Sequence, residues 1–163
     1  MPMTLEGRCQ CGAVRFTLES HAPVPYQRCY CTICRKTAGT GGFAINIGGI
    51  ADTLQVSGTE AVGVFRAALD RDGAAVLSAE RRHYCTGCGT ALWITDPGAP
   101  DSVFPFAAAI DTALPAPPEQ VHIMLSHKAP WVTVPEGPEH RHFNDFPEET
   151  IADWHKARDL WMD

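Results

Sequence analysis

The sequence lacks a long apolar run, an N-terminal targeting signal and a cluster of positive charge. Its longest apolar stretch, Val103 to Ile110, is broken by Pro105 and is much shorter than the ~20 residues that cross a bilayer. Residues 1–6 have neither the basic start nor the apolar run of a secretory signal. The 13 Lys and Arg face 19 Asp and Glu, giving a formal net charge of −6. We therefore expect a cytoplasmic protein that binds neither membranes nor nucleic acid.

The number of cysteines is odd, and this disfavours a framework of disulfides. The chain has seven of them, and they are clustered rather than scattered. In a reducing compartment, clustered cysteines more often bind metals or take part in reactions than form cross-links. We therefore expect the cysteines to be metal ligands or reactive groups.

Short runs of alternating apolar and polar residues predict a mainly β fold. Such runs occur at residues 14–18 and 43–47. Further strands are expected at residues 54–57, 62–69, 81–84, 91–95, 103–110, 121–125 and 131–134. The 13 Pro and 14 Gly fall between these runs, where they set turns. The spacing suits antiparallel sheets in a single domain of residues 1–163.

One helix is expected, at about residues 147–161. Pro147 fits a first helical turn, and Ile151, Trp154 and Trp161 recur near helical spacing. The apolar side of this helix is expected to pack onto a sheet, as is usual for a stripe of this kind.

The spacing of the cysteines indicates two metal sites. The cysteines form three groups: Cys9 and Cys11; Cys29, Cys31 and Cys34; and Cys85 and Cys88. A structural zinc site takes four thiolates, and close pairs can supply two each. The natural partition puts the first and last pairs, here called the outer four, in one closed site. It leaves the middle group, here called the trio, in a second site with an open position, as catalytic metals require.

Other partitions and roles are compatible with the same spacing. A single four-thiolate site could combine cysteines of the first and middle groups. The trio could also be a second structural zinc site with a histidine as fourth ligand, a redox-active set of thiols, or a site that has lost its metal. An iron–sulfur cluster is disfavoured, because the C-x-C-x-x-C spacing does not match the usual cluster motifs.

Several segments around the cysteines resemble a known family. These segments are residues 7–12, 29–36, 84–89, 121–123 and 126–132, in this order. Together they resemble the glutathione-dependent formaldehyde-activating enzyme family, over roughly Gly7 to Val134. The expected C-terminal helix lies outside the matched motifs.

The resemblance implies a fold, a metal content and a reaction. It implies a tent-like, mainly antiparallel β fold with two Zn²⁺ per chain, a structural ion on the outer four and a catalytic ion on the trio. It also implies that glutathione adds to formaldehyde to give S-(hydroxymethyl)glutathione, a carbon–sulfur lyase reaction run in the synthetic direction. The partners would be a small thiol and a small aldehyde. Relatives such as centromere protein V have binding roles instead, so membership alone leaves function open.

The chain departs from the family pattern at Tyr30, where the family usually has His. If this position only packs, the change is harmless. If it tunes the metal or moves a proton, the formaldehyde activity would change.

Candidate site residues follow from the chemistry of an open zinc site. Cys29, Cys31 and Cys34 would be the catalytic ligands, at which glutathione would bind as a thiolate. Glutathione carries two carboxylates, and Arg35, Lys36 and Lys128 are the predicted cations for them. His122, His83 and Tyr30 are the candidate proton donors to the aldehyde oxygen, although each is also a usual packing or surface residue.

Two alternatives to an enzyme remain open from the sequence. In the first, both metal sites are structural and the protein is a zinc-stabilised binding module. In the second, the trio cycles between thiols and a disulfide and acts as a redox sensor.

Overall fold

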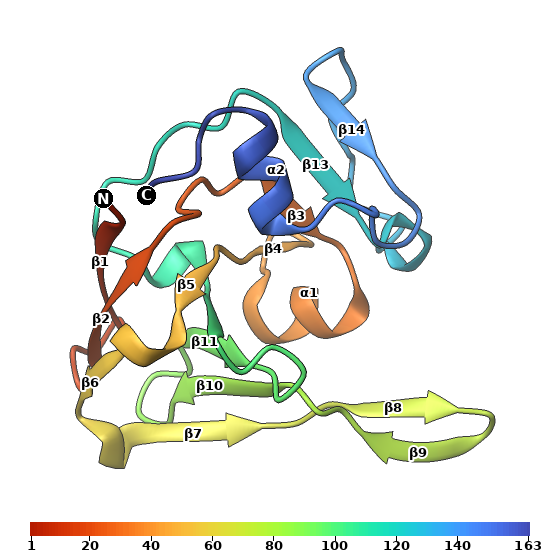
Figure 1. The fold of residues 1–163 in the computed structure, drawn as a ribbon. Coiled ribbons are helices and arrows are strands. Elements are labelled where there is room, and N and C mark those ends of the chain that lie inside the picture. The colour runs from red at the N-terminus through yellow and green to blue at the C-terminus, as the bar shows by residue number, and fades with distance from the viewer.

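A computed structural model describes residues 1–163, and it confirms the mainly β prediction (Figure 1). The strands form three sheets and a separate hairpin. There are two short α-helices, α1 (Thr32–Ala38) and α2 (Ile151–Ala157). Neither helix has the length and apolar character needed to span a membrane.

The first sheet carries the N-terminal alternating pattern. Its strands, in spatial order, are β1 (Met3–Arg8), β2 (Arg15–Ser20) and β6 (Gln55–Ser57), all antiparallel. Leu5 pairs with Leu18, and both are fully buried. Gly7 pairs with Phe16, whose ring occupies the space that a side chain at position 7 would need. The alternation therefore places one face of this sheet in the core, as predicted.

The second sheet packs against the first. Its strands, in spatial order, are β5 (Gly49–Ile50), β12 (Ser102–Pro105), β11 (Ala91–Thr95), β10 (Arg81–Cys85) and β7 (Val62–Phe65). Leu92, Trp93 and Val103 share one core cluster with residues of β1 and β2. The ring of Trp93 meets that of Phe16 edge-on, with centroids 5.2 Å apart.

The third sheet contains the first residue of the trio. Its strands, in spatial order, are β14 (His140–His142), β13 (Gln120–Ile123), β3 (Gln27–Cys29) and β4 (Ala44–Ile45). Strand β13 runs parallel to both β3 and β14, whereas all other strand pairs are antiparallel. Parallel neighbours need a long connection, and here the whole second sheet lies in the chain between β3 and β13.

The hairpin of β8 (Ala68–Arg71) and β9 (Ala74–Leu77) extends away from the body of the molecule (Figure 1). Its turn is formed by Asp72 and Gly73, both with positive φ, the geometry that suits a two-residue hairpin turn. Val76 and Leu77 are exposed on it.

Several predicted strands are shorter than expected or absent. The expected strand at 62–69 is divided between β7 and β8, and the one at 103–110 ends at Pro105. The strand expected at 121–125 ends at Ile123, because Met124 has a φ of 59° and turns the chain. Residues 131–134 form no strand.

The C-terminal helix is present but shorter than the predicted 147–161. Thr150 caps it by accepting a hydrogen bond from the Asp153 amide at 3.1 Å, so Pro147 lies before the helix rather than in its first turn. Trp154 stacks on Tyr26 with ring centroids 3.6 Å apart. The helix thus packs onto the body of the protein, as predicted. Helix α1 was not predicted.

Candidate metal centres

The outer four cysteines converge where the β1–β2 loop meets the end of β10. Their sulfur atoms all lie within 4.8 Å of one another. Cys9 and Cys85 are buried, whereas Cys11 and Cys88 are exposed. The sequence predicted this grouping of four, and the structure brings the same four together.

The geometry of the outer four fits a tetrahedral zinc site. The Cys11 sulfur lies 3.5 Å from that of Cys9 and 3.7 Å from that of Cys85. A tetrahedron with zinc–sulfur bonds of about 2.3 Å has sulfur–sulfur edges of about 3.8 Å. Gly12 and Gly89 have φ of +78° and +76°, a left-handed conformation that lets both loops turn back toward the sulfurs. Four thiolates are the donor set that zinc favours.

The trio is assembled at the start of α1. Cys29 ends β3, Cys31 is the residue before the helix, and Cys34 lies in the first turn. The Cys31 sulfur caps the helix by accepting a hydrogen bond from the Cys34 amide at 3.3 Å. All three sulfurs lie within 4.8 Å of one another, so one ion can bind to all of them.

The three thiols of the trio do not ionise equally. Hydrogen bonds from the Cys29 and Cys34 thiols lower the pKa of Cys31 to about 2. The Cys31 and Cys34 thiols raise the pKa of Cys29. These hydrogen bonds therefore favour the thiolate form at Cys31, and a cation bound to all three sulfurs would displace the protons of the other thiols.

The trio lines a cavity of about 400 Å³. This volume lies in the range of small-molecule sites. Its polar lining comes from six side chains: Gln27, Asn46, Ser78, Glu80, Arg82 and Asp96. The outer four do not line it. The trio is therefore open to a ligand-sized space, and the outer four lie outside that space.

Arg82 contacts the trio, and the sequence analysis did not single it out. Its side chain comes from β10 and is 7% exposed. The two terminal guanidinium nitrogens lie 3.7 and 3.8 Å from the Cys34 sulfur, and Nη2 forms an ion pair with Glu80 at 3.0 Å. The sequence feature that could have identified Arg82 is a charged residue inside a predicted strand, three positions before Cys85.

The structure does not bring the three predicted glutathione-binding cations to this cavity. Arg35 and Lys36 line a separate cavity of about 230 Å³. Lys128 donates hydrogen bonds to the carbonyls of Ala129 and Val132 at 3.2 and 2.8 Å. Their roles in glutathione binding remain predictions.

The candidate proton donors also lie elsewhere. Tyr30 is fully buried, and its hydroxyl lies 2.8 Å from Nδ1 of His122. Nε2 of His122 lies 3.0 Å from Nδ1 of His140. His83 lies beside Trp93, with its ring stacked on the indole. None of the three candidates lines the cavity of the trio, and Tyr30 occupies a packed position in a small buried cluster.

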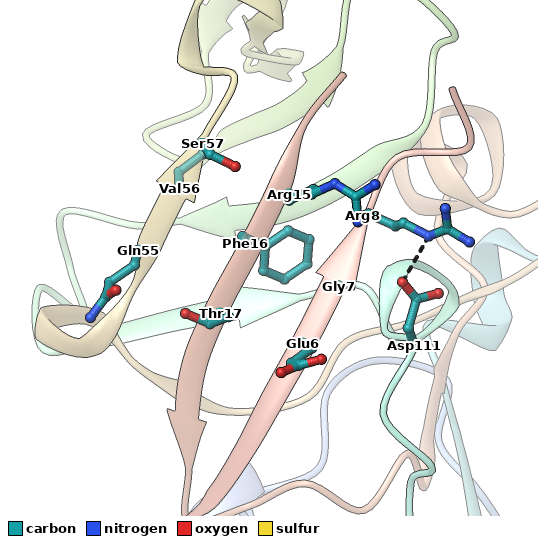
Figure 2. A pocket seen from close by; sticks show the side chains of 10 residues that line it. All are labelled: Glu6, Gly7, Arg8, Arg15, Phe16, Thr17, Gln55, Val56, Ser57 and Asp111. Carbon is teal, nitrogen blue, oxygen red and sulfur yellow. Dashed lines mark hydrogen bonds and ion pairs between the residues drawn. The ribbon is translucent and has the colours of Figure 1, made fainter. Parts of the chain in front are cut away.

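A third cavity, of about 360 Å³, lies on the first sheet (Figure 2). Arg8 and Asp111 form an ion pair at its edge at 3.0 Å, and Arg15 and Glu6 add further charge. It contains no cysteine, and so it is separate from both clusters.

Comparisons with known proteins agree with the sequence resemblance. The family described as glutathione-dependent formaldehyde-activating enzyme matches residues 4–127. A Halomonas elongata protein, whose name provisionally describes it as such an enzyme, is 51% identical over 153 residues, covering 94% of this chain and 95% of its own.

A crystal structure of a Rhodobacter sphaeroides protein shows the same fold. It has a TM-score of 0.51 at 23% identity, and the match covers 69% of this chain and 92% of that one. The family match and the Halomonas relative each cover most of this chain. The chain therefore belongs to the glutathione-dependent formaldehyde-activating enzyme family.

Proposed function

We propose that the chain adds glutathione, or a similar thiol, to formaldehyde or another small aldehyde at a metal ion held by Cys29, Cys31 and Cys34. The family supplies the reaction class. The observation that carries the proposal is the position of the three clustered sulfurs on the wall of a ligand-sized cavity. The reaction is that of a carbon–sulfur lyase run in the synthetic direction.

We assign two Zn²⁺ per chain. The outer four would hold a structural ion with all positions filled, and the trio would hold an ion with a fourth position left for the substrate thiol. A zinc ion bound there would lower the pKa of an incoming thiol and hold it as a thiolate. No cysteine is in a disulfide, and this supports our proposal of a reducing, cytoplasmic location.

Arg82 would act as a positioning residue beside the trio. Its guanidinium donates toward the Cys34 sulfur and is held by Glu80. A fixed cation next to three thiolates offsets part of their mutual repulsion and orients the Cys34 sulfur. We expect Arg82 to strengthen metal binding by the trio without affecting the outer four.

The cavity would bring the thiol and the aldehyde together. Holding two reactants at near-attack distance removes most of the entropic cost of their encounter. In the reaction a bond forms between the thiol sulfur and the carbonyl carbon, and the carbonyl π bond opens. The thiol's proton ends on the former carbonyl oxygen, so no oxidant or reductant is needed.

The test is the rate at which the protein exchanges formaldehyde with its glutathione adduct. Two-dimensional NMR exchange spectroscopy measures this rate directly, above the uncatalysed background. We expect the wild-type protein to accelerate exchange. Cys31→Ser should reduce that acceleration by more than about 100-fold, because the loss of a direct ligand should cost more than the 10–100-fold typical of a change in residues beside the ligands.

Other results would favour the alternatives. If glutathione binds without any acceleration, the protein is a binding module. If the protein holds one zinc and the trio forms a disulfide under mild oxidation, it is a redox sensor.

A further inference from the structure

The cavity of the trio is mainly apolar, and this bears on the identity of its substrate. Apart from the cysteines, its apolar lining comes chiefly from Leu69, Ile94, Phe104, Ile123, Met124 and Phe146. These residues lie in or beside β8, β11, β12 and β13, with Phe146 between β14 and α2. Segments far apart in the sequence thus contribute to one apolar wall.

Formaldehyde does not need such a wall. It has two heavy atoms, which correspond to roughly 60 Å³ at about 30 Å³ per water-sized group. The cavity has about 400 Å³. Formaldehyde also has no alkyl group, so it gains nothing from apolar side chains.

The charged ends of glutathione do not account for the wall either. The cavity is lined by two carboxylates, Glu80 and Asp96, and by one cation, Arg82. That cation is already paired with Glu80 and with the Cys34 sulfur. The two carboxylates of glutathione would therefore lie outside the cavity, leaving the apolar wall to the other reactant.

The wall is open at its outer edge. Phe146 is 70% exposed although it lines the cavity, and Leu69 is half-buried at the base of the hairpin. An exposed aromatic ring at the mouth of an apolar cavity suits a ligand whose carbon chain extends from the sulfurs toward the surface.

From these observations we infer that the physiological aldehyde is larger than formaldehyde and carries an alkyl or aryl chain of several carbons. This inference rests on the proposed function. The thiol sulfur bonds to the carbonyl carbon at the trio, the proton moves to the oxygen, and the carbon chain lies against the apolar wall.

The test uses stable thioether analogues of the adduct, because their binding does not depend on turnover. Isothermal titration compares S-hexylglutathione with S-methylglutathione on the wild-type protein. Each buried methylene contributes roughly a fourfold gain in affinity, so a chain buried over about half its length gives about 30-fold tighter binding. Equal affinity for the two analogues, including no binding of either, would overturn the inference.

Two wall variants and a matched control locate the binding site. Leu69→Ser and Phe146→Ser should each lower the affinity for S-hexylglutathione by roughly fivefold, and the affinity for S-methylglutathione by less. Leu77→Ser changes an exposed leucine of the same hairpin outside the cavity, and should have no effect. A chain-length preference that survives both wall variants would also contradict the inference.

The failure of this inference and that of the proposed function are distinguishable. Formaldehyde exchange without a chain-length preference in binding leaves the proposed function standing and removes the larger substrate. A chain-length preference in binding without exchange of formaldehyde or hexanal supports the apolar site and removes the catalytic role.

Discussion

The two cysteine clusters place the same side chain in different surroundings. In the outer four, Cys11 and Cys85 are 74 residues apart in sequence, and an ion between them would join the first sheet to the second. The trio comes from six consecutive residues and lines a cavity. Ligands remote in sequence cross-link a fold, whereas ligands close in sequence can change without breaking long-range contacts. A site built from ligands close in sequence, such as the trio, can therefore take part in a reaction without also holding the fold together.

The largest expected effect is the loss of folding in Cys88→Ser. Structural zinc in small peptides contributes roughly 10–16 kcal/mol, which is comparable with the whole stability of a domain. Cys88 is exposed, so its replacement removes a ligand but little packing. Circular dichroism should show loss of cooperative thermal unfolding. Cys31→Ser is the control and should keep it. If Cys88→Ser unfolds cooperatively at the same temperature as the wild-type protein, the outer four are not a structural site.

The next effect distinguishes the clusters by metal affinity. Arg82→Gln removes the cation beside Cys34, and we expect zinc binding at the trio to weaken by about 10–100-fold. Competition with a chromogenic chelator measures the affinity for the more weakly bound of the two expected zinc ions. Arg81→Gln, on the exposed side of the same strand, is the matched control. An equal effect of both variants would show that general charge, and not the contact with Cys34, is responsible.

Acid should destabilise the protein through His122, which lies in β13 of the third sheet. Burial, followed by the charges of Arg28, His142 and His140, lowers the pKa of His122 to about 4. Below about pH 6.5, the ordinary pKa of histidine, the unfolded chain binds a proton that the native state does not. This contribution to stability is therefore complete above pH 6.5 and is lost as the pH falls toward 4.

Urea unfolding at pH 7.5 and pH 5 measures this loss. We expect about 2 kcal/mol from His122 over this range. His122→Asn should remove that part of the pH dependence, while any acid release of metal remains in both proteins. An unchanged pH dependence in His122→Asn would contradict the assignment.

The smallest effect concerns Tyr30, the position at which the sequence departs from the pattern that the resemblance implies. Tyr30→Phe removes the hydroxyl bonded to His122, and should lower the free energy of unfolding by about 1 kcal/mol. Because Tyr30 does not line the cavity, the rate of exchange between formaldehyde and its glutathione adduct should be unchanged. Tyr84→Phe, on an exposed tyrosine, is the control for stability. A loss of exchange in Tyr30→Phe alone would show that this hydroxyl takes part in the chemistry.

The partition of the cysteines and the mainly β fold could be predicted from the sequence. Alternation at residues 14–18 reports burial on one face of β2, and short-spaced thiols are a specific pattern. The strands and the short-spaced groups depend on local spacing, which a sequence states directly. The joining of the two remote pairs followed from ligand number, because a closed zinc site takes four thiolates. The strand ends were less predictable, because positions such as Met124 adopt a left-handed conformation without the glycine that usually marks it.

The surroundings of the trio could not be predicted in the same way. Helix α1 has one buried residue, Cys34, and so no apolar periodicity marks it. Once the helix forms, Arg35 and Lys36 point away from the Cys34 side, because residues one and two apart do not share a helix face. Arg82 reaches Cys34 across 48 positions, and no local pattern encodes that contact.

Native mass spectrometry of the wild-type protein and Cys31→Ser, with and without glutathione, tests the central claim most directly. We predict two zinc ions per wild-type chain and a glutathione adduct that forms on this species. Cys31→Ser should hold one zinc ion and form no adduct. The same metal count in both proteins, or an adduct of equal abundance on both, would contradict the claim that the trio holds an ion with a position open to a thiol.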